Sequence, residues 1–160
     1  METKTVTNNL GFFLEHVSSL FAKQLDQVLL EQLGIGYAQF KVLRVLMDHG
    51  TVGQHHIAKE LGQTEASISR QMRLLQDDGF VRSETDPHNR RQRLSLLTHK
   101  GRRFVLAADQ LLEQFEQTIF EPFKRKELHT LQQTLDRIHD HAHNRTAHIP
   151  TDYVDFLESL

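Results

Sequence analysis

The sequence contains neither cysteine nor tryptophan. Without cysteine, the chain can form no disulfide and no thiol-based redox sensor, and the default expectation is a cytoplasmic protein. It also has no run of about eighteen apolar residues, which is what a membrane-spanning helix requires. The first residues show no basic start followed by an apolar stretch, so we expect no signal peptide.

Signatures of enzymes are missing too. The chain has no nucleophile motif, no glycine-rich phosphate loop and no HExxH pair. We therefore predict that the protein is not an enzyme and that it uses no cofactor. What is present is a chain of 160 residues with 38% hydrophobic content, enough for one domain with a substantial core.

The net charge of −2 hides an uneven distribution. Residues 54–104 contain ten Lys or Arg and six Asp or Glu, a balance of +4, whereas the rest carries nine and fifteen, a balance of −6. A basic segment within an acidic frame indicates a localised surface for a polyanion. The alternative is a solvated face that has no partner.

Apolar residues recur at steps of three and four through most of the chain, which is typical of amphipathic helices. Glycine, proline and capping residues mark where these helices end. The predicted helices are 10–33, 37–49, 54–61, 65–78, 99–120 and 124–143. The first is so broadly apolar that we expect it to pack against a second partner besides its own domain. The predicted fold class is mainly α with a small antiparallel β-hairpin.

Two of these helices, 54–61 and 65–78, are separated only by Gly62, Gln63 and the N-capping residue Thr64. Such a short glycine turn indicates a helix-turn-helix motif. The packing side of the second helix is predicted to carry Ile68, Met72 and Leu75. The opposite side and its shoulders carry Ala66, Ser67, Ser69, Arg70, Arg73 and Asp77.

The composition of that opposite side is suited to a DNA major groove. Small side chains allow a close approach, serine can bond a base or a phosphate, and arginine can bind guanine O6 and N7. An ordinary solvated surface is the alternative. At the end of the same helix, Asp77 and Asp78 place acid where the helix dipole favours base.

A strand–loop–strand pattern follows directly, in the stretch FVRSETDPHNRRQRLSLLT from Phe80 to Thr98. Asp86 with Pro87 begins a turn, and Arg90 and Arg91 then fall at the tip. Arginine at a narrow tip can enter a minor groove, where the negative potential is strong. Asp86 is close enough in the loop to pair with an arginine and orient it. A hairpin that serves only solubility is the alternative.

Together, these segments resemble a winged helix-turn-helix transcriptional regulator of the MarR family. The resemblance is carried by the stretches IAKELG (57–62), SISR (67–70), GFV (79–81), DPHNRR (86–91) and LSLLTHKG (94–101). It implies an obligate homodimer on a pseudo-palindromic operator. It also implies a DNA-binding lobe over about residues 37–98 and a helical dimerisation lobe over about residues 8–33 and 99–160.

The resemblance also assigns DNA contacts to positions of this chain. In the second helix of the motif, 65–78, which the resemblance makes the recognition helix, these are Ala66, Ser67, Ser69 and Arg70, with Arg73 nearer to phosphate. In the wing they are Arg90 and Arg91, with Asp86 orienting them and Arg93 in support. At the start of the preceding helix, Gln54, His55 and His56 are expected to meet the DNA backbone or solvent.

Members of the family often respond to a small aromatic or phenolic effector, which the resemblance places in a crevice between the dimerisation helices and the winged lobe. The candidate lining residues are Phe13, His16, Phe40 and Arg44. For Phe13, His16 and Phe40, simple packing in the core is the alternative.

Eleven histidines raise the question of a metal. His139 and His143 share a helix face, with His141 between them, His148 beyond, and Asp136 or Asp140 in reach. Since structural zinc sites need four organised ligands and no cysteine is available, a solvated histidine cluster without metal is the preferred interpretation.

The predicted function is therefore a sequence-specific, ligand-responsive regulator of transcription, a repressor that binds double-stranded DNA as a homodimer and has no membrane partner. The alternatives are a winged helix used only for protein interaction and a metal-responsive regulator using the C-terminal histidines. The apolar tail 151–160, with Tyr153, Phe156 and Leu157, is hypothesised to pack across the dimer partner.

Overall fold

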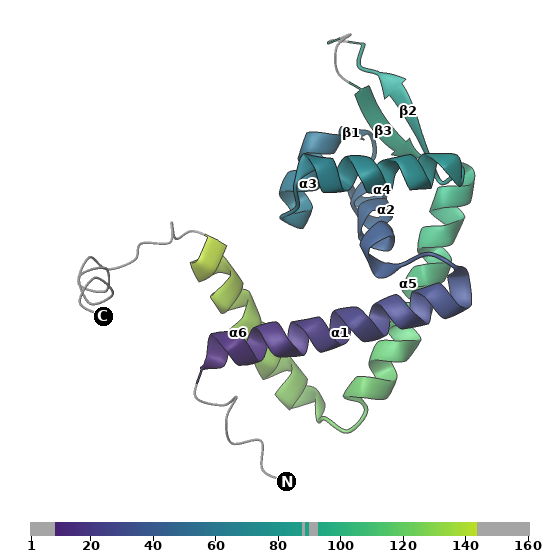
Figure 1. The fold of residues 1–160 in the computed structure, drawn as a ribbon. Helices are drawn as coiled ribbons and strands as arrows, with labels where there is room; N and C mark the ends of the chain where they lie inside the picture. The colour runs from purple at the N-terminus through teal and green to yellow at the C-terminus, as the bar shows by residue number, and fades with distance from the viewer. Residues whose placement is uncertain (1–8, 88, 90–92, 144–160) are drawn as a thin grey trace, which may run out of the picture. The chain divides into compact units, whose positions relative to one another are not determined.

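The computed structural model describes residues 9–87, 89 and 93–143, and its elements are labelled in Figure 1. The helices in this part of the chain are α1 (Leu10–Leu33), α2 (Tyr37–His49), α3 (Gln54–Leu61), α4 (Glu65–Asp77), α5 (His99–Phe120) and α6 (Arg125–His143). The strands are β1 (Val52–Gly53), β2 (Val81–Thr85) and β3 (Arg93–Leu97). The predicted fold class is confirmed, and each predicted helix is present with its ends within one residue of the expected positions.

The chain divides into two compact units, Met1–Phe115 and Glu116–Leu160. The first unit holds the hydrophobic core, which runs from Leu25 on α1 to Leu112 on α5. Helices α1 to α5 all contribute fully buried side chains, and Leu43, Ile57 and Ile68 on α2, α3 and α4 are among those with no exposed surface. Burial of an aliphatic side chain of this size contributes about 1.5–3 kcal/mol, so these helices are held by their apolar stripes.

The β-sheet has three antiparallel strands in the order β1-β3-β2. β2 pairs with β3 from Val81 opposite Leu97 to Thr85 opposite Arg93, which forms the predicted hairpin. β1 pairs with the other edge of β3, where Val52 lies opposite Ser95. β1 was not predicted from the sequence, because two residues are too few to show the alternation that identifies a strand.

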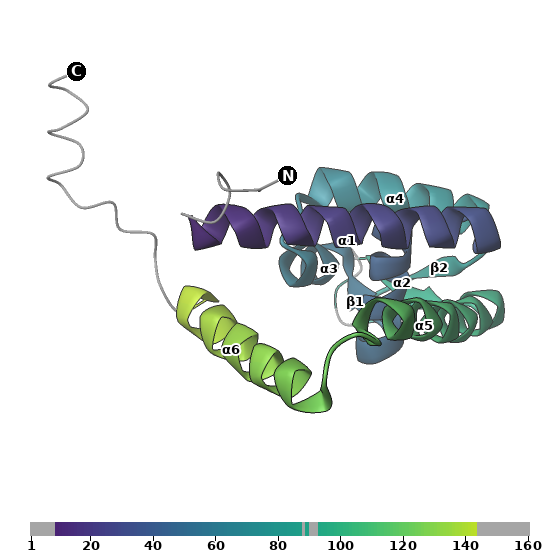
Figure 2. The same cartoon turned by 90° about the horizontal axis from the view of Figure 1, so that it is seen from below.

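Helix α1 is a long straight rod in both ribbon views (Figures 1 and 2). It begins at the cap Asn9, whose side chain accepts a hydrogen bond of 3.2 Å from the backbone N–H of Phe12. Only its C-terminal half contributes buried side chains, namely Leu25 and Leu29. The N-terminal half leaves four large apolar side chains exposed, which are Leu10 (64%), Phe12 (62%), Phe13 (41%) and Leu20 (49%). The surplus apolar surface expected of the first helix is therefore present.

Helix α6 lies in the second unit and follows a short turn after α5. Its start is capped by Glu127, whose carboxylate accepts a hydrogen bond of 2.8 Å from the backbone N–H of Lys124. Leu131, Leu135 and Ile138 recur along it at helical spacing and are 49%, 37% and 39% exposed. Among the described residues, α6 is thus an amphipathic helix whose apolar side is largely uncovered. No helix in the described part of the chain has the length and apolar character needed to cross a membrane.

Candidate nucleic-acid interface

The helix-turn-helix is built by α3, a turn over residues 62–64, and α4. Gly62 takes a left-handed conformation with φ of 60°, which a side chain would strain. Its N–H bonds to the carbonyl of Lys59 at 3.3 Å, and the N–H of Gln63 bonds to the carbonyl of Ala58 at 2.9 Å. Thr64 then caps α4 by accepting a hydrogen bond of 3.2 Å from the N–H of Ser67. These local bonds set the angle between α3 and α4.

Helix α4 divides into two faces as predicted. Ile68, Met72 and Leu75 are buried at 0%, 1% and 0% exposure and anchor the helix to the core. The other face presents Ala66, Arg70 and Arg73, which are exposed. Within the described residues, the guanidinium groups of Arg70 and Arg73 make no hydrogen bond or ion pair. These two guanidinium groups, next to the small side chain of Ala66, form a surface that can bind phosphate and base edges.

A side-chain network at the start of α4 went unnoticed in the sequence. Gln63 Oε1 accepts hydrogen bonds from Ser67 Oγ at 3.1 Å and from Gln71 Nε2 at 2.9 Å. Gln71 Nε2 also lies 3.3 Å from Ser67 Oγ. The network therefore holds the Ser67 hydroxyl in one orientation on the shoulder of the exposed face. The spacing of four residues along Gln63, Ser67 and Gln71 is the signal that could have revealed it.

A side-chain contact joins the first turns of the two motif helices. His55 Nδ1 lies 2.9 Å from Glu65 Oε1, and their side chains are 78% and 64% exposed. Helix α3 begins after Gly53, which supplies no side-chain cap, so the first N–H groups of α3 have no such partner. Gln54 is half-buried at this same end. The start of α3 thus offers backbone donors next to an exposed imidazole.

His56 does not follow its expected placement. It was predicted to face DNA or solvent, but its Nε2 atom is buried and has no hydrogen-bond partner among the described residues. Its ring packs edge-on against His49, with the ring centroids 4.9 Å apart. The expectation was wrong because it treated neighbouring histidines alike, although one residue of helix turns a side chain by about 100°.

The wing leaves the core directly after α4. Gln76 of α4 donates a hydrogen bond to Ser83 of β2, which fixes the base of the hairpin to the recognition helix. Asp86 is half-buried, and its backbone carbonyl accepts a hydrogen bond of 3.2 Å from the N–H of Asn89. Arg93 is exposed at the start of β3. Arg90 and Arg91 lie outside the described residues, so their contacts stay predictions.

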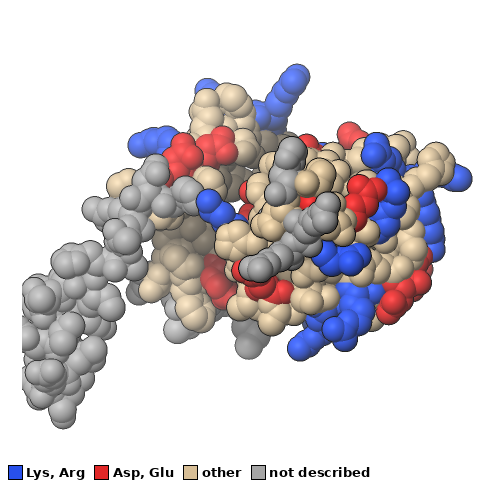
Figure 3. Space-filling view, turned by 90° about the horizontal axis from the view of Figure 1, so that it is seen from above, with Lys and Arg blue, Asp and Glu red and all other residues tan. Residues whose placement is uncertain are grey.

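Basic side chains gather on the face seen in Figure 3, where blue Lys and Arg atoms collect on the right and red carboxylates lie between them. The acidic end of α4 is stabilised by a cation from α5. Lys100 donates a hydrogen bond of 2.6 Å from its Nζ to the backbone carbonyl of Asp78. The positive charge that favours a helix C-terminus is therefore supplied by α5 rather than by α4 itself.

The candidate effector residues lie in different environments. Phe40 is part of the core at 6% exposure, which is the packing role that the sequence had left open for it. Phe13 and His16 are exposed on the N-terminal half of α1. Arg44 donates to Asp109 at 2.6 Å and makes two hydrogen bonds to Asp48, at 2.8 and 3.2 Å. Its charge is therefore already matched by two carboxylates.

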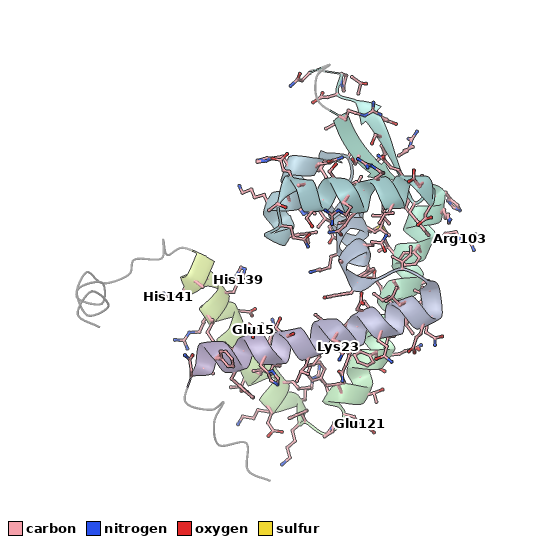
Figure 4. The ribbon with its side chains drawn as sticks, in the orientation of Figure 1. Glu15, Lys23, Arg103, Glu121, His139 and His141 are labelled. Atoms are coloured by element: carbon pink, nitrogen blue, oxygen red, sulfur yellow. The ribbon has the colours of Figure 1, made fainter. Side chains whose placement is uncertain are left out.

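The C-terminal histidines do not converge where the structure describes them. His139 and His141 point to opposite sides of α6 near its end (Figure 4), as a spacing of two residues requires. His139 Nδ1 lies 3.4 Å from its neighbour Asp140. The side chain of His143, and all of His148, fall outside the described residues.

The described geometry is that of a winged helix-turn-helix: a first helix packed on the core through Ile57 and Ala58, a second helix with one exposed face, and a β-hairpin that leaves the core beside it. The sequence model of the MarR family matches residues 33–92, which include α2, α3, α4 and β2. The chain is 28% identical over 121 residues to the HTH-type transcriptional regulator YdcH of Bacillus subtilis, covering 73% of this chain and 82% of the relative. It is also 28% identical over 99 residues to the transcriptional regulator HosA of Escherichia coli O111:H-, covering 55% of this chain and 73% of that protein.

Solved structures agree with this assignment. A mutant MarR from Escherichia coli complexed with operator DNA matches with a TM-score of 0.73 and 25% identity, over 81% of this chain and 92% of that one. A MarR-like transcription regulator from Bacillus cereus matches with a TM-score of 0.73 and 27% identity, over 82% of this chain and 94% of that one. The fold and site thus define a DNA-binding transcriptional regulator of the winged helix-turn-helix class. In sequence and in fold, the chain is thus similar to transcriptional regulators of the MarR family.

Proposed function

We propose that the protein is a homodimeric repressor that binds a pseudo-palindromic operator and releases it when a small effector binds. The observation that carries this proposal is the exposed face of α4, where Arg70 and Arg73 have no protein partner among the described residues and Ala66 leaves room for close approach. Buried Ile68, Met72 and Leu75 fix the opposite face, so the helix presents these groups on a rigid support.

The proposed contacts fall into base-reading and backbone-positioning groups. Arg70 reads a base edge, and Ser67 and Ser69 bond bases or phosphate at the groove edge, with Ser67 already oriented by Gln63. Arg73 binds phosphate. Positioning on the DNA backbone comes from the start of α3 and from the wing, through Gln54, His55, Asp86, Arg90, Arg91 and Arg93.

Homodimer formation is proposed from the apolar surfaces of the terminal helices. A row of exposed apolar side chains on α1 and another on α6 exceed what an isolated chain exposes without penalty. Under this proposal residues 37–98 form the DNA-binding lobe, and residues 8–33 and 99–160 form the dimerisation lobe. A regulator of this kind works in the cytoplasm, where its DNA is.

For the effector we propose a small aromatic or phenolic compound whose binding changes the spacing of the two winged lobes. Successive major grooves on one DNA face lie about 34–36 Å apart. A shift of a few ångströms in each winged lobe would therefore take the two α4 helices out of register with the grooves. Phe13 and His16 remain the candidate contacts. Arg44 would have to leave Asp48 or Asp109 to bind an acidic effector, because both carboxylates now bind it.

The proposal is tested by DNase footprinting on DNA from upstream of the protein's own gene, combined with a titration of binding stoichiometry. We expect protection of two sequence-related half-sites about one helical turn apart, and two chains per site. Protection of a single half-site by one chain would contradict the homodimer. Absence of any protection at low salt would favour a winged helix that serves protein interaction.

A further inference from the structure

Three potential metal-binding side chains meet where the end of α2 packs against α3. His49 is the last residue of α2, whereas His56 and Glu60 lie one turn apart on α3. One ligand atom from each of the three residues lies within 4.8 Å of the other two. We propose that His49, His56 and Glu60 form a binding site for a divalent transition-metal ion of the zinc class.

The distances are close to what such an ion requires. Ligand atoms bound to one tetrahedral Zn²⁺ at about 2.0–2.2 Å are about 3.3–3.6 Å apart. His49 Nε2 and Glu60 Oε1 are already 3.9 Å apart, and the remaining separations do not exceed 4.8 Å. Side-chain rotations that shift each ligand atom by about 1 Å would therefore bring the three atoms to these separations, with no movement of either helix.

The ligand chemistry selects the kind of cation. Two imidazoles and one carboxylate suit zinc, nickel, cobalt or copper, whereas magnesium and calcium prefer oxygen ligands alone. Two histidines with one glutamate and a water in the fourth position are a known zinc arrangement. Because His49 and Glu60 are 41% and 51% exposed, the cluster is open to solvent and leaves room for that water.

A second observation concerns His56 itself. Nε2 of His56 is buried and has no hydrogen-bond partner in the described structure. A buried polar nitrogen without a partner is unfavourable, and a metal ion bound at this nitrogen would satisfy it. The other interpretation is that the two imidazoles merely pack edge to face, as the interplanar angle of 69° allows. That interpretation predicts no response to metal.

The location gives the site a consequence for the DNA-binding lobe. Helix α3 is followed after three residues by the recognition helix α4. An ion bound by His49, His56 and Glu60 would join the end of α2 to α3 and so hold the first helix of the motif in place. Because the ion binds only the folded chain, it raises the melting temperature. This inference does not depend on the proposed repressor function.

The test is isothermal titration calorimetry with ZnCl₂, together with thermal melting. The background chain carries His139→Gln, His141→Gln and His143→Gln, which remove the other histidine cluster. We expect one zinc ion per chain and a raised Tm in this background. Either His49→Gln or His56→Gln should weaken zinc binding at least about 100-fold, since even outer-shell changes weaken metal sites 10–100-fold.

The matched control is His55→Gln, which removes an imidazole one residue from His56 that pairs with Glu65 instead. It should bind zinc like the background, and MgCl₂ should not raise Tm in any variant. Unchanged zinc affinity in His49→Gln, or no zinc bound by the background, would overturn the proposal. His49 is exposed at a helix end, so its variant decides the matter even where His56→Gln impairs folding.

Discussion

Gly101 is the residue at which the start of α5 comes closest to the base of the wing. A Cβ placed on it would lie 2.2 Å from the backbone oxygen of Phe80. That oxygen cannot move easily, because it accepts hydrogen bonds from both the N–H and the hydroxyl of Thr98, at 3.0 and 3.1 Å. The approach of the two backbones therefore requires glycine here.

We expect Gly101→Ala to lower the free energy of unfolding by about 2–3 kcal/mol, as overpacking of a rigid core contact does. The measurement is urea denaturation followed by circular dichroism. Gly11→Ala is the control, because its Cβ would meet only the side chain of Asn9 at 3.4 Å. Equal stability of Gly101→Ala and the wild type would show that the contact with Phe80 relaxes freely.

Arg70 and Arg73 are exposed on the same helix but are proposed to have different roles. Arg70→Ala should lose about 1–3 kcal/mol of preference for the correct base pair and so narrow the gap between operator and unrelated DNA. Arg73→Ala should weaken binding to both duplexes alike and reduce the slope of log affinity against log salt by about 0.9. Anisotropy titrations on both duplexes measure this. An equal loss on the two duplexes for Arg70→Ala would remove its base-reading role.

Among the individual residues, those defined by local signals were predicted well. Thr64 was predicted from the sequence as an N-cap, and it accepts the expected backbone hydrogen bond at 3.2 Å. The cluster of His49, His56 and Glu60 was not anticipated. It depends on how α2 packs against α3, and no periodicity within a single helix reports that packing.

At the scale of elements, the wing is the hairpin of β2 and β3, and its base is fixed to the rest of the lobe. Gln76 binds Ser83 at one side, and the Thr98 hydroxyl donates to the carbonyl of Gly79 at 2.7 Å on the other. These bonds hold both strands where they leave the core. A change at the loop between the strands should therefore affect DNA binding without unfolding the lobe.

We expect the double variant Arg90→Ala, Arg91→Ala to bind operator more weakly by about 1–3 kcal/mol per lost contact, with an unchanged melting temperature. The matched control is Arg82→Ala, on the same hairpin, because Arg82 is already paired with Glu84 at 3.0 Å. Fluorescence anisotropy measures the affinity. If the double variant bound like the wild type, the wing would not contact DNA.

Helices were easier to predict than strands because their signals are longer. The apolar stripe of α5 extends over 22 residues, and a cap and a proline mark its limits. β1 has only two residues and exists because β3 offers it a free edge. Within β3, Ser95 is buried at 1% exposure while Leu94 and Leu96 are only half-buried. Side-chain polarity alone would predict the serine to be exposed and the leucines to be buried. The observed burial follows from the pairing of β3 with a strand on each of its edges.

At the scale of the whole molecule, the exposed apolar side chains of α1 and α6 are the feature on which the proposed homodimer rests. Leu20 on α1 and Leu131 on α6 are each 49% exposed. A second copy of the chain is the proposed cover for both. The hypothesis that the tail 151–160 also packs across the partner concerns residues outside those that the structure describes.

We expect Leu20→Glu and Leu131→Glu each to convert the dimer to monomer at micromolar concentration, because a carboxylate buried without a partner is strongly unfavourable. Light scattering coupled to size-exclusion chromatography gives the mass. The control is Leu74→Glu, which has the same change at a similar exposure of 50% on α4. If all three variants kept the wild-type mass, other surfaces would hold the dimer.

Sequence-specific DNA binding is tested most directly by fluorescence anisotropy of the wild-type chain at several salt concentrations. The duplexes are DNA from upstream of its own gene and a scrambled sequence of equal composition. We predict tighter binding to the upstream duplex, with log affinity falling against log salt at a slope of about −4 or steeper, as several phosphate contacts require. Equal affinity for both duplexes, or affinity that does not change with salt, would contradict a regulator that reads DNA through α4 and the wing.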